Sequence, residues 1–182
     1  MRRFVIAVAV VAVCVATCAV YAADDKPFDF RNVRWGMTKD EVLKSEGEKP
    51  TFESTGSNSI SMNDYLFSKK VKLSYIFDDN ERLYAAYYSL DKENNPNITE
   101  MELKLYYNKL IDVLSEKYGS HKQGEIHTSS TKEALEWNSG DTQVTIRLGS
   151  HNGRLLMLLS YHSKDLKAKQ DERSKQRNKE KL

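Results

Sequence analysis

Apolar residues recur along the chain with two different periods, and each period predicts one kind of element. Between residues 100 and 118 they return every three or four positions, which is typical of an amphipathic helix. Between residues 71 and 77 they alternate with other residues, which is typical of a strand with one buried face. The alternation returns in residues 144–148 and 155–161. The pattern therefore predicts helices packed against a sheet.

A short helix is predicted near the start of the chain. Thr38 and Glu41 have the spacing of a capping box, in which each side chain accepts a hydrogen bond from the backbone N–H of the other residue. We expect the helix to begin at Lys39. It should stop near Glu46, because Gly47 suits the left-handed backbone that follows many helices.

The same device returns about sixty residues later. Thr99 and Glu102 form a second capping box, and Gly119 follows the last apolar residue of the helical pattern, Tyr118. Strand-like segments follow each predicted helix. Residues 23–163 are therefore expected to form a duplicated α+β domain. It would consist of two tandem helix-plus-antiparallel-strands units, about residues 28–91 and 97–163, with the helices packed on one face of an antiparallel sheet.

Turn residues predict how the strands pair. Asp78-Asp79-Asn80 suggests a tight turn with Asn80 in the left-handed region, and Asn152-Gly153 suggests a second hairpin. The expected neighbours are Leu83 with Tyr75, Ala85 with Leu73, and Tyr87 with Val71 in the first hairpin, and Leu148 with Met157, Ile146 with Leu159, and Val144 with Tyr161 in the second. Residues 51–63 are rich in Ser, Thr, Asn and Gly and are expected to be a loop with at most a weak strand.

The first 22 residues have the features of an export signal. Two arginines precede a long apolar run, and small residues stand at the expected cleavage positions. We therefore expect an exported protein of the periplasm or cell envelope of a bacterium. An uncleaved anchor and a lipid on Cys18 are the alternatives, and either would bring the chain to a membrane. Cys14 and Cys18 both lie in the signal, so the mature chain has no thiol for a disulfide, a nucleophile or a metal.

Charge divides the mature chain into two parts. The whole chain has 28 basic and 26 acidic residues, and two of the basic ones are in the signal, so the mature charge is zero. Residues 164–182 carry eight Lys or Arg against four Asp or Glu, which gives this tail a charge of +4 and the body −4. The tail has almost no apolar residues and is expected to be a frayed or solvated helix. The alternative is an electrostatic contact with an anionic lipid, a cell-wall polymer or the acidic body.

Common catalytic and cofactor patterns are absent from the sequence. The four histidines are His121, His127, His151 and His162; none has a metal-site spacing, and titrating surface residues are the expected interpretation. No nucleophile elbow, phosphate loop or dinucleotide fingerprint occurs. We predict no catalytic residue, no metal and no cofactor, and no nucleic-acid partner.

A binding surface remains as the candidate functional feature. The expected registers place a set of tyrosine, cationic and aliphatic side chains on the sheet face away from the helices, where such residues favour partner binding. The candidate partner-binding residues are Lys72, Arg82, Tyr84, Tyr88, Arg147 and Leu158. The alternative is that loops or a second layer cover this face.

The segment Trp35-Gly36-Met37-Thr38-Lys39-Asp40-Glu41-Val42, followed by Gly47 and Pro50, resembles exported bacterial domains of the SmpA/OmlA type. It is also similar to the β-lactamase-inhibitor-protein-like fold. The resemblance implies two helix-plus-strands units in one curved sheet and an envelope setting. It transfers no partner-contacting residue.

These observations favour a non-catalytic protein-binding or scaffold module that docks an envelope protein. A periplasmic domain that binds a small ligand or a polysaccharide through its tyrosines is one alternative. A hydrolase with an unrecognised carboxylate site is the other.

Overall fold

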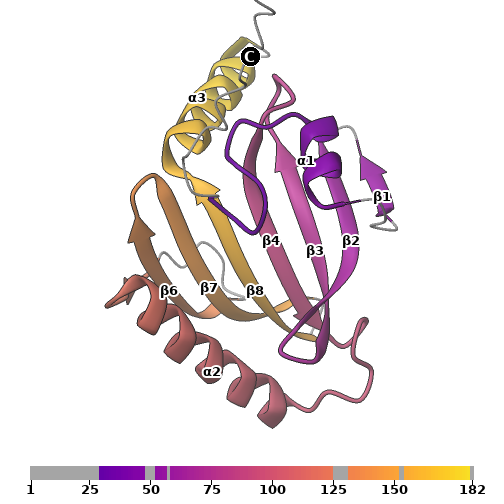
Figure 1. The fold of residues 1–182 in the computed structure, drawn as a ribbon. Helices are drawn as coiled ribbons and strands as arrows, with labels where there is room; N and C mark the ends of the chain where they lie inside the picture. The colour runs from indigo at the N-terminus through magenta and orange to yellow at the C-terminus, as the bar shows by residue number, and fades with distance from the viewer. Residues whose placement is uncertain (1–28, 48–51, 57, 125–130, 152–153, 181–182) are drawn as a thin grey trace, which may run out of the picture.

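The computed structural model describes residues 29–47, 52–56, 58–124, 131–151 and 154–180 (Figure 1). The elements are α1 (Lys39–Ser45), β1 (Phe52–Gly56), β2 (Ser59–Leu66), β3 (Lys69–Phe77), β4 (Leu83–Asp91), α2 (Glu100–Tyr118), β5 (Lys122–Gln123), β6 (Thr131–Ser139), β7 (Thr142–His151), β8 (Arg154–Ser163) and α3 (Lys164–Glu180). The predicted signal, the Asn152-Gly153 turn and Pro50 lie outside the described residues.

The eight strands of the described residues belong to one sheet, with the order β1-β2-β3-β4-β8-β7-β6-β5. Every pair of neighbours in this order is antiparallel. A helix followed by four strands occurs twice along the chain, and the last strands of the two series, β4 and β8, pair with each other. The fold is α+β, as the sequence predicts.

Both capping boxes form where the sequence predicts them. The Thr38 hydroxyl accepts the N–H of Glu41 while the Glu41 carboxylate accepts the N–H of Thr38, and Thr99 with Glu102 repeats the arrangement. Gly47 and Gly119 follow the two helices with φ of +89° and +82°. The predicted bounds of both helices are therefore confirmed, because the capping groups are local and need no distant contact.

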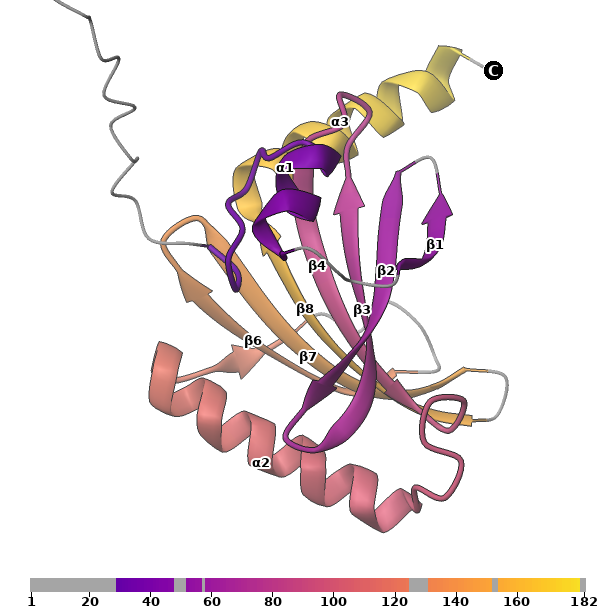
Figure 2. The same cartoon turned by 45° about the vertical axis from the view of Figure 1, so that its right-hand side comes forward.

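The helices α1 and α2 lie on one face of the sheet, over opposite ends of its strands (Figures 1 and 2). Val42 of α1 and the apolar stripe of α2 join the same buried cluster as the inward side chains of the strands. One row of this core crosses the sheet through Leu73, Tyr88, Leu159 and Ile146, which are neighbours in the strand register. We call this side the helix face and the other side the outer face.

The first two strands replace the loop predicted for residues 51–63. Ile60 and Met62 of β2 are buried and alternate with polar residues. Two apolar residues are too few to predict a strand from the sequence. The chain turns after β2 through Phe67 and Ser68, both with positive φ, where the sequence has no glycine or asparagine to indicate a tight turn. The prediction of a loop was wrong because pairing with β3 outweighs the low apolar content.

The predicted register of β3 and β4 is also wrong. Leu83 pairs with Phe77, and one extra residue, Tyr84, is inserted before Ala85 pairs with Ile76. The positive φ in the turn belongs to Glu81 and not to Asn80. Because side chains alternate along a strand, an odd shift exchanges its two faces. Tyr88 therefore points into the core, and Tyr87 takes its place on the outer face.

The predicted register of the second pair of strands, β7 and β8, is confirmed. Leu148 pairs with Met157, Ile146 with Leu159, and Val144 with Tyr161. All six side chains belong to, or pack against, the buried cluster on the helix face. The register that places Arg147 and Leu158 on the outer face is therefore correct.

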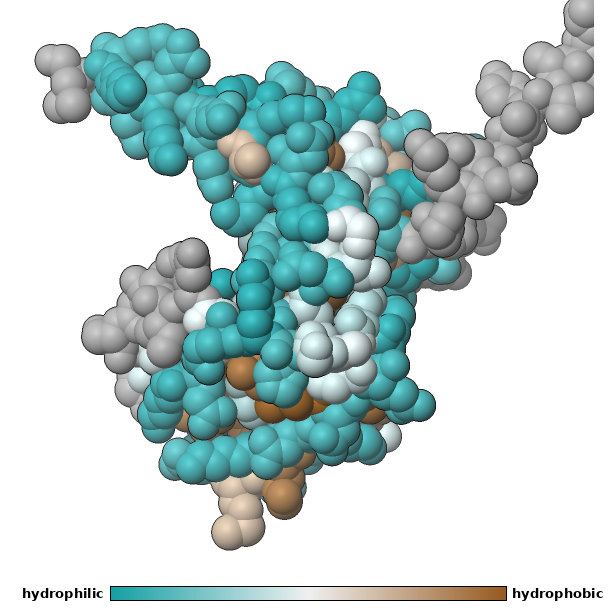
Figure 3. Space-filling view, turned by 90° about the vertical axis from the view of Figure 1, so that its left-hand side faces the viewer, coloured by the Kyte–Doolittle hydropathy of each residue, from teal (hydrophilic) through white to brown (hydrophobic). Residues whose placement is uncertain are grey.

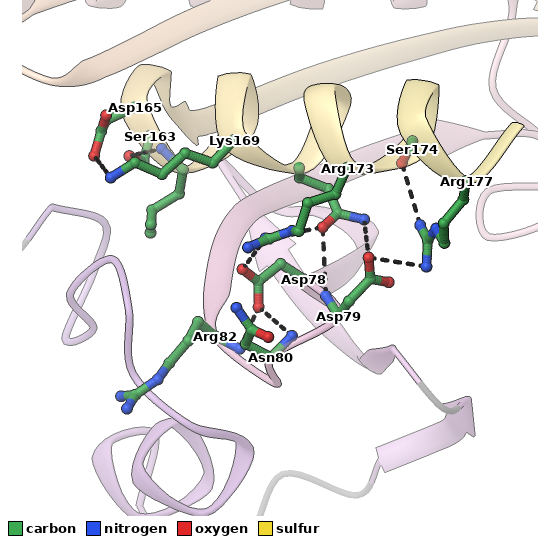
Figure 4. A network of polar contacts seen from close by, with 12 residues as sticks. Asp78, Asp79, Asn80, Arg82, Ser163, Asp165, Lys169, Arg173, Ser174 and Arg177 are labelled. Atoms are coloured by element: carbon green, nitrogen blue, oxygen red, sulfur yellow. Dashed lines mark hydrogen bonds and ion pairs between the residues drawn. The ribbon is translucent and has the colours of Figure 1, made fainter. Parts of the chain in front are cut away.

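The basic tail forms α3, and no pattern in the sequence predicted where this helix would pack. None of its residues is buried, so its own apolar surface does not hold it. At its start, the Ser163 hydroxyl accepts the N–H of Leu166, and Asp141 accepts the N–H of Asp165. Farther along, Arg173 and Arg177 bind Asp78 and Asp79 of the β3–β4 turn (Figure 4). The tail is thus an ordered helix in contact with the acidic body, which was the alternative interpretation.

Candidate binding surfaces

The structure gathers half of the six candidate residues in one row on the outer face. Lys72 pairs with Ser89, Ser89 with Leu158, and Leu158 with Arg147, so the row crosses β3, β4, β8 and β7. Three strand spacings separate the two cationic residues, a distance of about 14 Å between backbones. We call Lys72, Ser89, Leu158 and Arg147 the outer row.

The two cations of the outer row are available to a partner. Lys72 and Arg147 are half-buried, and neither forms an ion pair within the part of the chain that the structure describes. Leu158 lies between them, also half-buried. The row therefore presents positive charge at both ends and an aliphatic side chain near its middle.

Tyr87 lies beside the outer row and is the aromatic residue that the sequence analysis missed. It pairs with Ser74 on one side and with Ser160 on the other. Burial raises the pKa of its hydroxyl, while the charge of Arg147 opposes this shift. Because both of these neighbours are serines, the ring of Tyr87 is much larger than the side chains on either side of it.

The other three candidate residues do not join this surface. Tyr88 lies on the helix face, 7% exposed. Tyr84 is half-buried and close to Lys167 and Asp171 of α3, and burial raises its pKa. Arg82 reaches the opposite way and donates to the backbone oxygen of Gly36 at 2.9 Å. Figure 4 shows its guanidinium directed away from α3. The proposed single patch was therefore wrong for Tyr88 and Arg82.

The second layer considered as an alternative exists, but it covers only one end of the outer face. The helix α3 follows β8 directly and packs against β4 and β8. In Figure 3 this helix projects as a hydrophilic arm, and the surface is hollowed below it. The outer row lies along β3, β4, β8 and β7, toward the end of the strands away from α3.

His162 is buried at the covered end and is not the surface histidine that was predicted. It is 8% exposed and hydrogen-bonds through Nε2 with Gln143 Oε1. Charged groups that face it are Lys167 and Asp171 of α3, Arg147 of β7 and Glu136 of β6. Burial, with the positive charges of Lys167 and Arg147, lowers its pKa to about 4. His121 is exposed, as predicted, and His127 and the side chain of His151 lie outside the described residues.

The low pKa of His162 predicts a stability that decreases in acid. An unfolded histidine has a pKa near 6.5, so between about pH 6.5 and pH 4 the unfolded chain binds more protons than the folded one. Stability is therefore full above this window and falls as the pH is lowered through it. Thermal melts from pH 7 to pH 4 should show the parent losing more stability than a His162→Gln variant. Parallel pH profiles for the two proteins would contradict the assignment.

On the helix face, a cavity of about 340 Å³ lies between the N-terminal segment and the end of α2. Its lining residues are Asp29, Phe30, Arg31, Leu66, Tyr88, Lys117, Tyr118 and Tyr161. We call it the tyrosine pocket. Except for Tyr88, none of these residues was a candidate. They come from distant parts of the chain, and no spacing in the sequence links them.

An ion cluster around the buried carboxylate of Glu46 forms one wall of the tyrosine pocket. Arg31 binds Glu46 at 3.1 Å, binds Asp64, and donates to the Tyr88 hydroxyl at 3.2 Å. The Glu46 side chain is only 2% exposed and also accepts from the Tyr75 hydroxyl. Burial alone would lower the pKa of Arg31, but its interactions with Tyr88 and Glu46 raise the pKa above its usual value. The guanidinium is therefore a fixed positive charge.

Aromatic rings form the rest of the pocket. Phe30 contacts the rings of Tyr161, Tyr88 and Tyr75 at centroid distances of 4.8, 5.6 and 6.0 Å. The Tyr161 hydroxyl hydrogen-bonds with Tyr118, and burial raises its pKa, so it stays protonated at neutral pH. The ammonium of Lys117 lies over the Tyr118 ring at 4.9 Å. The pocket thus combines aromatic faces with fixed hydrogen-bonding groups.

The described residues contain neither a metal site nor a membrane-spanning helix. Within these residues no group of three or more His, Cys, Asp or Glu side chains is arranged to hold a metal ion. None of the described helices is long and apolar enough to cross a membrane.

Comparisons with known proteins leave the family open. No family model matches the chain, and no match was found among curated proteins. The crystal structure of a DUF4309 family protein (YjgB) from Bacillus subtilis is similar, with a TM-score of 0.39 and 13% identity over 69% of this chain and 78% of that one. A similarity at this level supports no argument about fold or function.

Proposed function

We propose that the protein is an exported, non-catalytic module that docks an acidic segment of another envelope protein on its outer face. The observation that carries this proposal is the outer row, in which two cations that form no ion pair with any described residue lie on either side of Leu158. The export signal predicted from the first 22 residues supports the envelope setting.

The chemistry of the outer row favours a partner with two acidic groups about 14 Å apart and an apolar residue between them. Acidic side chains would complement Lys72 and Arg147, and the apolar one would rest on Leu158 beside Tyr87. Charge complementarity of this kind steers association and fixes the register of the partner. The segment would cross the strands, because the outer row runs across β3, β4, β8 and β7.

A photoreactive amino acid at Leu158 would test the docking surface in cells that carry the partner. We expect a defined cross-linked product that a Lys72→Glu/Arg147→Glu variant reduces about tenfold or more, because charge reversal at a central contact costs on the order of 1–3 kcal/mol. Salt should weaken the same product in a washed envelope preparation.

Two controls make this experiment specific. A Lys92→Glu/Arg154→Glu variant reverses two exposed charges that lie outside the outer row, and it should leave the product unchanged. The photoreactive residue at Met101, which is 74% exposed on α2, should not give the product. The same product from Met101, or a product indifferent to both charge reversals, would refute docking at the outer row.

A further inference from the structure

Arg31 combines two costly features at the edge of the tyrosine pocket. Its φ of +50° lies in the left-handed region, which is uncommon for a residue other than glycine. Its side chain also holds an ion cluster together with Glu46, whose carboxylate is almost completely buried. Burying such charges costs desolvation free energy that their attraction often fails to recover. Backbone strain at Arg31 and a buried carboxylate on its partner Glu46 favour a functional role for the cavity beside them.

The charges around the tyrosine pocket nearly cancel. Arg31 is offset by Glu46 and Asp64, which bind it, and Asp29 offsets Lys117 on the rim. The net charge of these five side chains is −1, and Arg31 is already paired with two carboxylates. An anionic ligand would therefore have no free countercharge except the exposed Lys117. This balance favours an uncharged ligand.

Donors and acceptors are both present in fixed positions. The hydroxyls of Tyr118 and Tyr161 bond to each other at the pocket, and the Tyr88 hydroxyl is held by Arg31. One carboxylate oxygen of Asp29, which lines the pocket, accepts the backbone N–H of Trp35 at 2.9 Å, and this hydrogen bond holds the acceptor group in place. A ligand with several hydroxyl groups can serve as donor to some of these groups and as acceptor from others.

The aromatic walls add a requirement for an apolar face. Tyr118 and Tyr161 are half-buried, so their rings are partly accessible, and Phe30 packs behind Tyr161. An aromatic face stabilises a flat C–H surface and excludes water from it. A volume of about 340 Å³ is at the lower end of the range for small-ligand sites, about 300–1,000 Å³.

We propose that the tyrosine pocket binds an uncharged saccharide. One sugar ring takes the place of the exposed Lys117 ammonium over Tyr118, and its hydroxyl groups bond to Asp29, to the displaced Lys117 and to the tyrosine hydroxyls. This site is on the opposite face of the sheet from the outer row and is independent of the docking function. It gives the protein a second surface, so that a glycan and a protein segment could be held at the same time.

Calorimetric titration with maltotriose, cellotriose and triacetylchitotriose would test the proposal. We expect saturable binding of at least one of these neutral sugars, weakened about tenfold or more in a Tyr118→Ala variant. Tyr84→Ala is the matched control, because Tyr84 is an equally half-buried tyrosine beneath α3, away from the pocket, and its removal should leave binding unchanged. Circular dichroism would establish that both variants are folded.

Four results would overturn the inference. The first is that none of the three neutral sugars binds to the parent protein. The second is tighter binding of glucuronate or glucosamine than of neutral sugars, which would contradict the charge balance. The third is tighter binding of adenosine, which would show an aromatic-base site and not a saccharide site. The last is equal loss of sugar binding in both tyrosine variants.

Discussion

Replacing Arg31 with Met is expected to lower the free energy of unfolding by about 3 kcal/mol. The substitution keeps the length of the side chain but leaves the Glu46 carboxylate, 2% exposed, without its cation. Asp64 also loses its partner, although at 26% exposure water can solvate it in part. Urea denaturation followed by circular dichroism would measure the loss.

A double-mutant cycle separates the ion cluster from ordinary packing. Glu46→Leu alone should be destabilising, because the hydroxyl of Tyr75 and the guanidinium of Arg31 lose an acceptor. The Arg31→Met/Glu46→Leu variant should then be more stable than the sum of the single losses predicts, by about 1–3 kcal/mol. Arg154→Met, at an exposed arginine, should change stability by less than about 0.5 kcal/mol. Additive losses in the cycle would show that Arg31 and Glu46 are not coupled.

Replacing Leu159 with Ala is expected to cost about 2–5 kcal/mol of stability. Leu159 is 1% exposed and lies between Tyr88 and Ile146, where the two series of strands meet. The cavity left by the substitution would be lined by both halves of the core, which limits how far the surroundings can relax. The denaturant midpoint should fall without a change in the slope of the transition.

The neighbouring residue is the control for Leu159. Leu158 belongs to the outer row, on the opposite face of the same strand. Leu158→Ala should cost no more than about 1 kcal/mol of stability, because little of the core is disturbed. It should, however, weaken the proposed docking. A larger loss of stability for Leu158→Ala than for Leu159→Ala would contradict the register of β8 and, with it, the location of the outer row.

The helices could be predicted from the sequence because their ends are encoded locally. Thr38 with Glu41, and Thr99 with Glu102, each satisfy the free backbone groups of one helix within four residues. The register of β7 and β8 was also predictable, since alternation and a strong turn signal agree. Leu158 and Arg147 were therefore placed correctly, and Lys72 was placed correctly by the alternation within β3.

The remaining part of the candidate surface depends on features that the sequence does not display. The extra residue at Tyr84 shifts the register of β4, and only the pairing of β4 with β3 and β8 determines where it is inserted. This shift alone moved Tyr88 to the helix face. The tyrosine pocket was missed for a different reason. The pocket forms only when the N-terminal segment and α2 pack on the assembled sheet, and no sequence motif is shared by Arg31, Tyr88, Tyr118 and Tyr161.

The position of β8 in the sheet has a consequence for how the protein folds after synthesis. In the finished sheet β4 is a central strand, but its second partner, β8, is the last strand in the chain. Until β8 arrives, β4 is an unpaired edge with apolar residues on one side, and such edges promote aggregation. The pairing of Ala85 with His162 also closes a long loop, which slows folding. We therefore expect the first half of the chain to be prone to aggregation until β8 has paired with β4.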